Sequence, residues 1–315
     1  MTEKSCLIVG AGIAGLAAAE QLSKNGWRIV VLDKGRAPGG RMATRQHGAT
    51  RFDHGAQFFT VRHASLESAV DNWITGGVVK RWFECAGHTR YCGAEGMSSI
   101  ARSMAATVDV RLNTTVKRVD RAGSRWQATT STGEQFRAEA LLLTAPVPQS
   151  LGMLSNLQDL SSGYETLLGI DYDPCLALMA RFSSPSRIPA PGYLRLDDGP
   201  IAVISDNSQK GISDGCADVT IHSTPSFART AAAMYEKDAA AELLKATEPW
   251  LGGVPDRWEL HRWRYSLPRT TYSEPCFFGC SPAAIAIAGD AFGGPRVEGA
   301  YLSGRAAAAR FLSLV

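Results

Sequence analysis

Residues 6–15 read Cys-Leu-Ile-Val-Gly-Ala-Gly-Ile-Ala-Gly, a short apolar run followed by three glycines in the spacing G-x-G-x-x-G. The apolar run is typical of a strand that is buried on both faces of a parallel sheet. After the third glycine, alanines and leucines predict a helix that ends near Asn25–Gly26. A second predicted strand covers residues 28–32 and ends at Asp33. A glycine triplet between a strand and a helix, with an acid about 20 residues further on, predicts a Rossmann-type unit that binds a dinucleotide.

Each position of this motif has a physical reason. Gly10 allows a tight turn, Gly12 lets the backbone approach a pyrophosphate, and Gly15 lets the helix pack close to the strand. The phosphates would meet the free N–H groups at the positive end of the helix dipole. Asp33 can accept both hydroxyls of an adenosine ribose. The alternative is a glycine-rich turn that binds nothing, and the complete strand–helix–strand context argues against it.

The loop that follows narrows the choice of dinucleotide. Residues 34–42 read Lys-Gly-Arg-Ala-Pro-Gly-Gly-Arg-Met. This loop resembles the second motif of the FAD-binding amine oxidase superfamily, in which the arginine, here Arg41, reaches the diphosphate or the flavin. A plain nicotinamide dehydrogenase has no such loop, so the resemblance implies FAD rather than NAD as the bound cofactor.

Two further segments resemble the same superfamily. Residues 284–290, Ala-Ile-Ala-Ile-Ala-Gly-Asp, predict a buried strand that ends in Gly-Asp, followed by a loop over 292–299 and a last helix over 300–314. The resemblance implies that Asp290 accepts from a ribityl hydroxyl and that the last helix faces the pyrimidine end of the flavin. In residues 48–60, the Asp-His-Gly-Ala-Gln string would bring backbone and Gln57 beside the isoalloxazine ring. Core packing explains Phe58–Phe59 equally well.

We therefore expect a noncovalent FAD site, because no cysteine lies in a recognisable tether sequence. The resemblance implies that Val116 lies where the superfamily clamps the adenine. The residues expected to contact FAD are Gly10, Ala11, Gly12, Ile13, Ala14, Gly15, Asp33, Lys34, Arg36, Gly40, Arg41, Met42, Gly55, Ala56, Gln57, Phe58, Val116, Ala145, Pro146, Gly289, Asp290, Val297, Gly299 and Ala300.

The rest of the chain predicts a second unit. From about residue 150, antiparallel strands are expected near 176–182, 193–196, 201–205 and 218–222, followed by one helix over 227–251 and a strand over 257–265. The predicted fold class is α/β: a Rossmann-type FAD-binding domain, similar to amine oxidases and p-hydroxybenzoate hydroxylase, with an α+β substrate domain on an antiparallel sheet. We assign 1–62, 96–150 and 265–315 to the cofactor domain, and 63–95 and 151–264 to the substrate domain.

Other short strings are similar to those of the renalase family, among them Gly-Gly-Arg-Met at 39–42, Pro-Val-Pro at 146–148 and Trp-Arg-Tyr-Ser at 263–266. This resemblance implies an oxidase of dihydronicotinamides reduced at the wrong ring carbon, which regenerates NAD or NADP and passes electrons to O₂ to give hydrogen peroxide. We expect the wall of its substrate pocket among Phe58, Phe59, Trp82, Tyr91, Trp263 and Tyr265, with Gln57 and the 96–100 segment, which begins at Gly96, nearby. No catalytic residue is assigned, because a dihydronicotinamide is electron-rich and needs alignment rather than a base.

Amine oxidation or desaturation on the same fold is the first alternative. Amine oxidases usually place a lysine beside flavin N5, whereas Lys210 lies in a polar Asn-Ser-Gln-Lys-Gly turn and Lys237 and Lys245 lie on a predicted helix. The second alternative is a flavin-binding protein without redox turnover. The Gly-Ile-Ser-Asp-Gly string at 211–215 matches a nucleophile pattern but follows a polar stretch, so we expect an ordinary turn.

Composition adds general limits. The net charge is +3 and the arginines are scattered, which gives no indication of a nucleic-acid partner. No apolar run approaches the ~20 residues that span a bilayer. The seven cysteines are dispersed without a C-x-x-C pair, as expected for a reducing cytoplasm, and the histidines show no metal-ligand spacing.

Overall fold

Strand β1 (Ser5–Val9) lies in the middle of a six-stranded sheet in the computed structural model, which describes residues 4–156, 160, 163–280 and 283–314. The strand order is β17-β18-β11-β1-β2-β7, and only β17 runs antiparallel to its neighbour. The other strands are β2 (Arg28–Leu32), β7 (Val110–Arg111), β11 (Ala140–Leu143), β17 (Phe277–Gly279) and β18 (Ala284–Ile287).

The apolar run of β1 is buried on both faces, as its composition predicts. Cys6 and Ile8 pack into a core with helices α1 (Ile13–Lys24), α3 (Ser98–Ala105) and α9 (Val297–Leu312). Leu7 and Val9 point to the opposite core, beneath a three-stranded meander and the helices α4 and α5. The elements of that second layer are β8 (Val116–Ala122), β9 (Arg125–Thr130), β10 (Gln135–Ala138), α4 (Val147–Met153) and α5 (Tyr164–Leu168).

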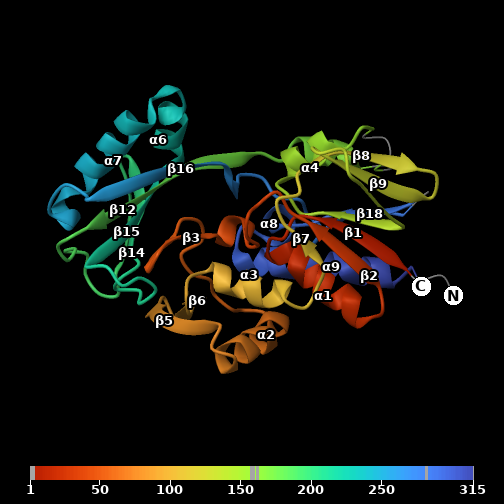
Figure 1. Ribbon diagram of the computed structural model, residues 1–315, viewed down its shortest axis with the longest axis horizontal. Coiled ribbons are helices and arrows are strands. Elements are labelled where there is room, and N and C mark those ends of the chain that lie inside the picture. Colours follow the sequence, from red (N-terminus) through yellow and green to blue (C-terminus); the bar gives the residue numbers. More distant parts are fainter. Residues whose placement is uncertain (1–3, 157–159, 161–162, 281–282, 315) are drawn as a thin grey trace.

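A five-stranded antiparallel sheet of order β13-β14-β15-β12-β16 forms the other end of the molecule (Figure 1). Its strands are β12 (Tyr172–Phe182), β13 (Tyr193–Asp198), β14 (Ile201–Asp206), β15 (Ala217–Ser223) and β16 (Arg257–Pro268). Side chains alternate across this sheet: Leu178, Ile204 and Ile221 pack beneath helices α6 (Pro225–Thr230) and α7 (Glu236–Leu251), forming a third core. The long strands β12 and β16 run from this sheet toward the part of the molecule that contains the six-stranded sheet (Figure 1).

Two hairpins lie between the large sheets: β3 (Thr44–His47) with β4 (Thr50–Asp53), and β5 (Val79–Cys85) with β6 (His88–Gly93). The short 3₁₀ turn Gly40–Met42 precedes β3, and helix α2 (Ala64–Thr75) precedes β5. Leu66 and Val70 of α2 pack in the first core, beside α9. The predicted domain boundaries at 62 and 95 therefore remain a proposal. Within the described residues, no helix is long and apolar enough to cross a membrane.

The single helix predicted over 227–251 is wrong. The chain forms α6, a 3₁₀ turn at Ala231–Ala233, and then α7, with extended backbone at Met234 and Tyr235. The Arg262 guanidinium donates to the carbonyl oxygens of Ala231 (2.9 Å) and Met234 (3.1 Å). Because β16 supplies these donors, the carbonyl groups at the break are satisfied without a continuous helix.

The last helix begins at Val297 rather than at 300, after a short helix α8 (Asp290–Gly293), of which residues 292–293 were expected to be loop. No serine side chain caps α3. Ser98 is the first residue of the helix, and the Ser99 hydroxyl donates to Gly96 O (2.8 Å). The first N–H groups of α3 instead meet side chains from the β3–β4 hairpin: Met97 N–H donates to Asp53 and Ser98 N–H to Thr44.

Candidate cofactor and substrate site

The segments expected to hold FAD follow neighbouring parallel strands. β2, β1, β11 and β18 are adjacent in the sheet, so their carboxyl ends meet along one edge. Gly10 follows β1, Asp33 follows β2, Ala145–Pro146 lie just beyond β11, and Gly289–Asp290 follow β18. The sheet thus brings together residues up to 280 positions apart in the sequence, at the edge where open α/β sheets bind ligands.

Two glycines of the first motif are required by close backbone approach. Gly10 has φ +116°, and a Cβ there would lie 2.4 Å from Thr144 Oγ1. A Cβ on Gly15 would lie 2.0 Å from Gly10 O. Helix α1 can therefore pack against the end of β1 only with glycine at these positions.

Gly12 serves a different purpose. A Cβ built on Gly12 would meet no heavy atom within 4 Å, although it sits at the N-cap of α1 and no side chain caps this helix. The space beside Gly12, at the start of α1, is therefore open. An anion fits such a position, because free N–H groups and the helix dipole both favour negative charge. Gly40 borders the same space, because a Cβ built on Gly40 would lie 3.7 Å from Gly12 Cα.

Asp33 is held in place by two backbone donors. Its Oδ2 accepts from Ala11 N (2.6 Å) and its Oδ1 from Gly35 N (2.6 Å). These bonds tie the end of β2 to the glycine loop and to the Lys34–Arg36 turn, whose lysine and arginine side chains are exposed. Each carboxylate oxygen keeps a second lone pair, which suits the predicted contact with ribose hydroxyls.

Arg41 connects the second and third motifs. Its guanidinium makes a bidentate ion pair with Asp290, with both N–O distances 2.7 Å, and it donates to Ser266 O (3.3 Å). Arg41 also lies over the Tyr172 ring, 5.7 Å from its centroid. Burial raises the pKa of Tyr172 to about 12, with the Asp290 carboxylate adding to the effect. The phenol therefore stays neutral and can accept from Val147 N (3.3 Å).

The remaining predicted cofactor residues occupy nearby turns and helix starts. Gly55 approaches Arg41 closely, since a Cβ there would lie 2.0 Å from Arg41 O, and Ala56 N–H donates to the same oxygen (2.9 Å). Met42 is buried in the first core. Ile13 and Ala14 form the first turn of α1, Val297, Gly299 and Ala300 form the first turn of α9, and Val116 begins β8.

The five-stranded antiparallel sheet, called the substrate sheet below because it lies in the predicted substrate domain, presents a polar face to the segment 53–58. Opposite the apolar side chains of the third core, β15 carries Thr220 and His222, and β16 carries His261 and Trp263. His54 stacks on Trp263 (centroids 5.4 Å), and its carbonyl oxygen accepts from Trp263 Nε1 (2.7 Å) and contacts His222 Nε2 (3.1 Å). The polar face of the second sheet therefore fixes the chain just before Gly55.

The histidines of this face are poor proton carriers at neutral pH. Burial lowers the pKa of His54 to about 3, with His261 and Arg45 adding repulsion. Burial also lowers the pKa of His222 and of His261. All three imidazoles are therefore neutral near pH 7.

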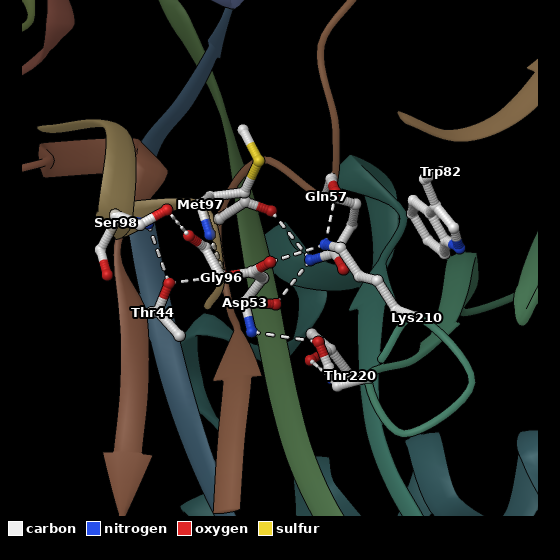
Figure 2. Close-up of polar contacts among 12 residues, drawn as sticks. Thr44, Asp53, Gln57, Trp82, Gly96, Met97, Ser98, Lys210 and Thr220 are labelled. Atoms are coloured by element: carbon white, nitrogen blue, oxygen red, sulfur yellow. Dashed lines mark hydrogen bonds and ion pairs between the residues drawn. The ribbon is translucent and has the colours of Figure 1, made fainter. Parts of the chain in front are cut away.

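A buried ion pair at the junction between the segment 53–58 and the substrate sheet was not predicted from the sequence. Lys210 was predicted to lie in a polar turn, but its side chain is fully buried and its Nζ lies 2.6 Å from Asp53 Oδ2, which is also fully buried (Figure 2). Lys210 also donates to Gln57 O and lies over the Trp82 ring, 4.8 Å from its centroid. The polar residues around Lys210 hide this burial. The sequence signal that could have revealed the pair is Asp53, an acid next to the apolar Phe52. Both residues are buried in β4, and a buried carboxylate needs a partner.

The aromatic residues expected around the substrate do not form one wall. Phe58 and Trp82 belong to a cluster with Phe83 and Tyr193, with neighbouring centroids 4.9–6.4 Å apart. Phe59 and Tyr91 instead stack on each other (5.6 Å) in the first core. Trp263 stacks on His54, and Tyr265 packs edge-on against Tyr172 (5.7 Å), next to Arg41. Gly96 lies beneath Thr44, with φ +100°.

Comparisons with known proteins match both parts of the chain to families. Residues 8–72 match the NAD(P)-binding Rossmann-like domain, and residues 74–312 match the flavin containing amine oxidoreductase family. Renalase from Mus musculus is 26% identical over 85% of this chain and 86% of its own length. A 1-hydroxycarotenoid 3,4-desaturase from Flavobacterium sp. is 43% identical, but over only 19% of this chain and 12% of its own length.

Among solved structures, a putative protoporphyrinogen oxidase from Exiguobacterium sp. 255-15 superposes with a TM-score of 0.78 at 14% identity, covering all of both chains. This likeness supports the predicted fold class, a Rossmann-type unit with an antiparallel substrate sheet, which is confirmed. The match over 74–312 covers most of the chain. The chain therefore belongs to the flavin containing amine oxidoreductase family, and FAD is its cofactor.

Proposed function

We propose that the protein is an FAD-dependent oxidase of misreduced dihydronicotinamide dinucleotides, the 2- or 6-dihydro isomers of NAD(P)H, which it returns to NAD(P)⁺. The observation that carries this proposal is the extent of the similarity to mouse renalase. It covers 85% of the chain, and so includes much of the substrate sheet, whereas the desaturase match covers 19%. The substrate itself is what the resemblance to the renalase family implies.

The fit of FAD to the chain rests on the open N-terminus of α1 and on the edge of the six-stranded sheet. We propose that the N–H groups after Gly12 hold the diphosphate, Asp33 the adenosine ribose, and the Arg41–Asp290 pair the ribityl side. No tether sequence is present, so we propose that the cofactor is held noncovalently. When bound, FAD would supply a hydride acceptor for the dihydropyridine ring and a carrier of both electrons to O₂, which with one further proton from solvent would give hydrogen peroxide.

The protonation states at the junction support a substrate that needs no base. His54, His222 and His261 are neutral, and Lys210 donates to Asp53 and Gln57 O. A dihydronicotinamide loses hydride from a neutral ring, driven by its ring nitrogen, and requires only alignment and exclusion of water. An ammonium substrate would first have to lose a proton, and none of these groups is poised to take it.

One observation favours a second candidate, an amine oxidase. The buried Lys210 touches the backbone of Gln57, which the resemblance puts beside the flavin. The argument that this chain lacks a lysine near the flavin therefore loses its force. Because Lys210 is paired with Asp53, we rank the amine oxidase as the second candidate.

Product analysis in air tests the proposal. FAD-loaded protein is mixed with purified 2-, 4- and 6-dihydro isomers of NADH and NADPH and, separately, with putrescine and other simple amines. We expect equal amounts of hydrogen peroxide and NAD(P)⁺ from a 2- or 6-dihydro isomer, with free FAD as the matched control. Peroxide from an amine, and none above the control from any isomer, would replace this proposal by the amine oxidase.

A further inference from the structure

We propose that Asp53 and Lys210 are a pair of positioning residues, which fix the backbone of residues 55–58 between the cofactor edge and the substrate sheet. This inference rests on the proposed function only in taking residues 55–58 as the segment beside FAD. It does not depend on the identity of the substrate.

The pair joins parts of the chain that lie 157 positions apart in the sequence. Asp53 ends β4, and its Oδ1 accepts from Thr44 Oγ1 (2.6 Å) and from Met97 N (2.8 Å) at the start of α3. Its Oδ2 receives Lys210, from the loop after β14. Asp53 N–H donates to Asn207 Oδ1 (3.2 Å) in the same loop. Figure 2 shows Asp53 between Thr44 and Met97 on one side and Lys210 on the other.

From Asp53 and Lys210 the contacts pass directly to Gln57. Lys210 donates to Gln57 O, while Gln57 Nε2 donates to the carbonyl oxygens of Asp53 and Gly55 (3.1 Å to Gly55). Two carbonyl acceptors define which end of the amide is nitrogen. Gln57 Oε1 therefore points away from them, buried and with no hydrogen-bond partner among the described residues. The pair thus determines where a free acceptor and the adjoining Phe58 ring are presented.

Stability alone does not account for such a pair. Both side chains are fully buried, so both charges lose their hydration, and apolar side chains of similar volume often give equal or higher stability. What an apolar replacement cannot supply is direction: the ammonium faces Asp53, Gln57 O and the Trp82 ring. In some proteins a buried ionic contact specifies one arrangement of the backbone rather than several, and we assign this role to the Asp53–Lys210 pair.

The decisive variant removes both charges together. Asp53→Asn with Lys210→Met leaves no unpaired buried charge, so we expect the protein to fold and to bind FAD. We expect amide hydrogen exchange within residues 54–59 to quicken about tenfold or more, because local opening becomes easier. We also expect the visible absorption bands of bound FAD to change shape. The single variant Lys210→Arg keeps the positive charge, and we expect its FAD spectrum to stay close to that of the parent.

Lys80→Met is the matched control. Lys80 also donates to the loop after β14, at Gly211 O (2.8 Å), but it is only half-buried and the hydrogen bond itself is exposed. Exchange at 54–59 and the FAD spectrum should stay at parent values in this variant. If the double variant shows parent exchange and a parent spectrum, the pair has no positioning role and the inference is wrong.

These readouts need no substrate, so they separate the inference from the proposed function. If no dihydronicotinamide reduces the parent protein while the double variant shows the exchange and spectral changes, the proposed substrate is wrong and the positioning role stands. If the single variant Lys210→Met does not fold, the double variant and Lys210→Arg still decide the question.

Discussion

Arg41 and Asp290 lie 249 positions apart in the sequence, yet they form a bidentate pair at the proposed cofactor edge. Arg45, four residues after Arg41, pairs with Glu259 (3.1 Å) and is similarly exposed, with 25% of its side chain accessible against 27% for Arg41. The two arginines therefore differ mainly in which site they face. This makes them a controlled comparison.

We predict that Arg41→Ala weakens FAD binding more than Arg45→Ala does. Loss of Arg41 removes a cation from the cofactor edge and leaves the Asp290 carboxylate unpaired there. A charge-assisted contact is worth about 1.5–3 kcal/mol, or roughly one to two decades in the dissociation constant. Titration of the apoprotein with FAD measures this constant, and equal values for both variants would remove Arg41 from the cofactor site.

His54 gives a prediction about acid stability. Its pKa is lowered to about 3 in the folded protein by burial, against an ordinary value of 6.5. Between these values the unfolded chain binds a proton that the folded chain does not, so the stability contribution is complete above pH 6.5 and is lost as pH falls toward 3. The slope from this single group is at most about 1.4 kcal/mol per pH unit.

We therefore expect His54→Gln to show a shallower loss of the free energy of unfolding between pH 6.5 and pH 4 than the parent. Urea melts of FAD-free protein at several pH values measure it. His88→Gln, at an exposed position, is the control and should keep the parent slope. A parent-like slope in His54→Gln would show that this imidazole titrates normally.

At the level of elements, α1 and α9 pack backbone against backbone. A Cβ on Gly304 of α9 would lie 2.0 Å from Ala14 O of α1, whereas a Cβ on Gly152 of α4 would meet nothing within 4 Å. Both glycines lie within helices, so alanine suits either backbone.

We predict opposite effects of alanine at these two positions. Gly304→Ala forces α9 away from α1 and should lower the free energy of unfolding by about 1–3 kcal/mol. Gly152→Ala should be neutral or stabilising by up to about 1 kcal/mol, since it only improves helix propensity. Thermal melts of both variants measure this, and equal melting temperatures would mean that the helices can separate without cost.

The elements were predictable wherever periodicity and local chemistry agree. The strand–glycine–helix start follows from the apolar run and the motif alone, and the antiparallel strands follow from alternation. The break near Met234 was not predictable, because its carbonyl groups are satisfied by Arg262, 28 positions away. The first turn of α3 is similar: its donors meet Asp53 and Thr44, so no local cap marks the helix start.

The candidate site, like the elements, was predictable from the sequence only in part. The residues proposed to hold FAD carry glycine and acid signals in short motifs, and the sheet brings these motifs to one edge. The Asp53–Lys210 pair depends on two sheets meeting, and its lysine lies in a stretch whose polar residues predict exposure. Likewise, Phe59 and Trp263 look alike as candidate pocket residues in the sequence, but one is core and the other stacks on His54.

For the whole molecule, we predict that the purified protein is yellow and releases FAD on denaturation. We propose that the motifs hold the phosphate, ribose and flavin ends of the cofactor, and no tether sequence accompanies them. Precipitation with acid followed by absorption spectra of pellet and supernatant measures the release. Colour that stays with the pellet would contradict noncovalent binding.

The central claim concerns the hydride donor, and anaerobic stopped-flow absorbance tests it most directly. FAD-loaded protein is mixed with each purified 2-, 4- and 6-dihydro isomer and with a panel of amines, and the bleaching of the flavin band is followed. We predict fast bleaching by the 2- or 6-dihydro isomer and slow bleaching by 4-dihydro NADH and amines, because misplacement of the donor carbon by about 1 Å costs roughly a hundredfold in rate. Fast bleaching by an amine, with none by any dihydronicotinamide, would contradict the account.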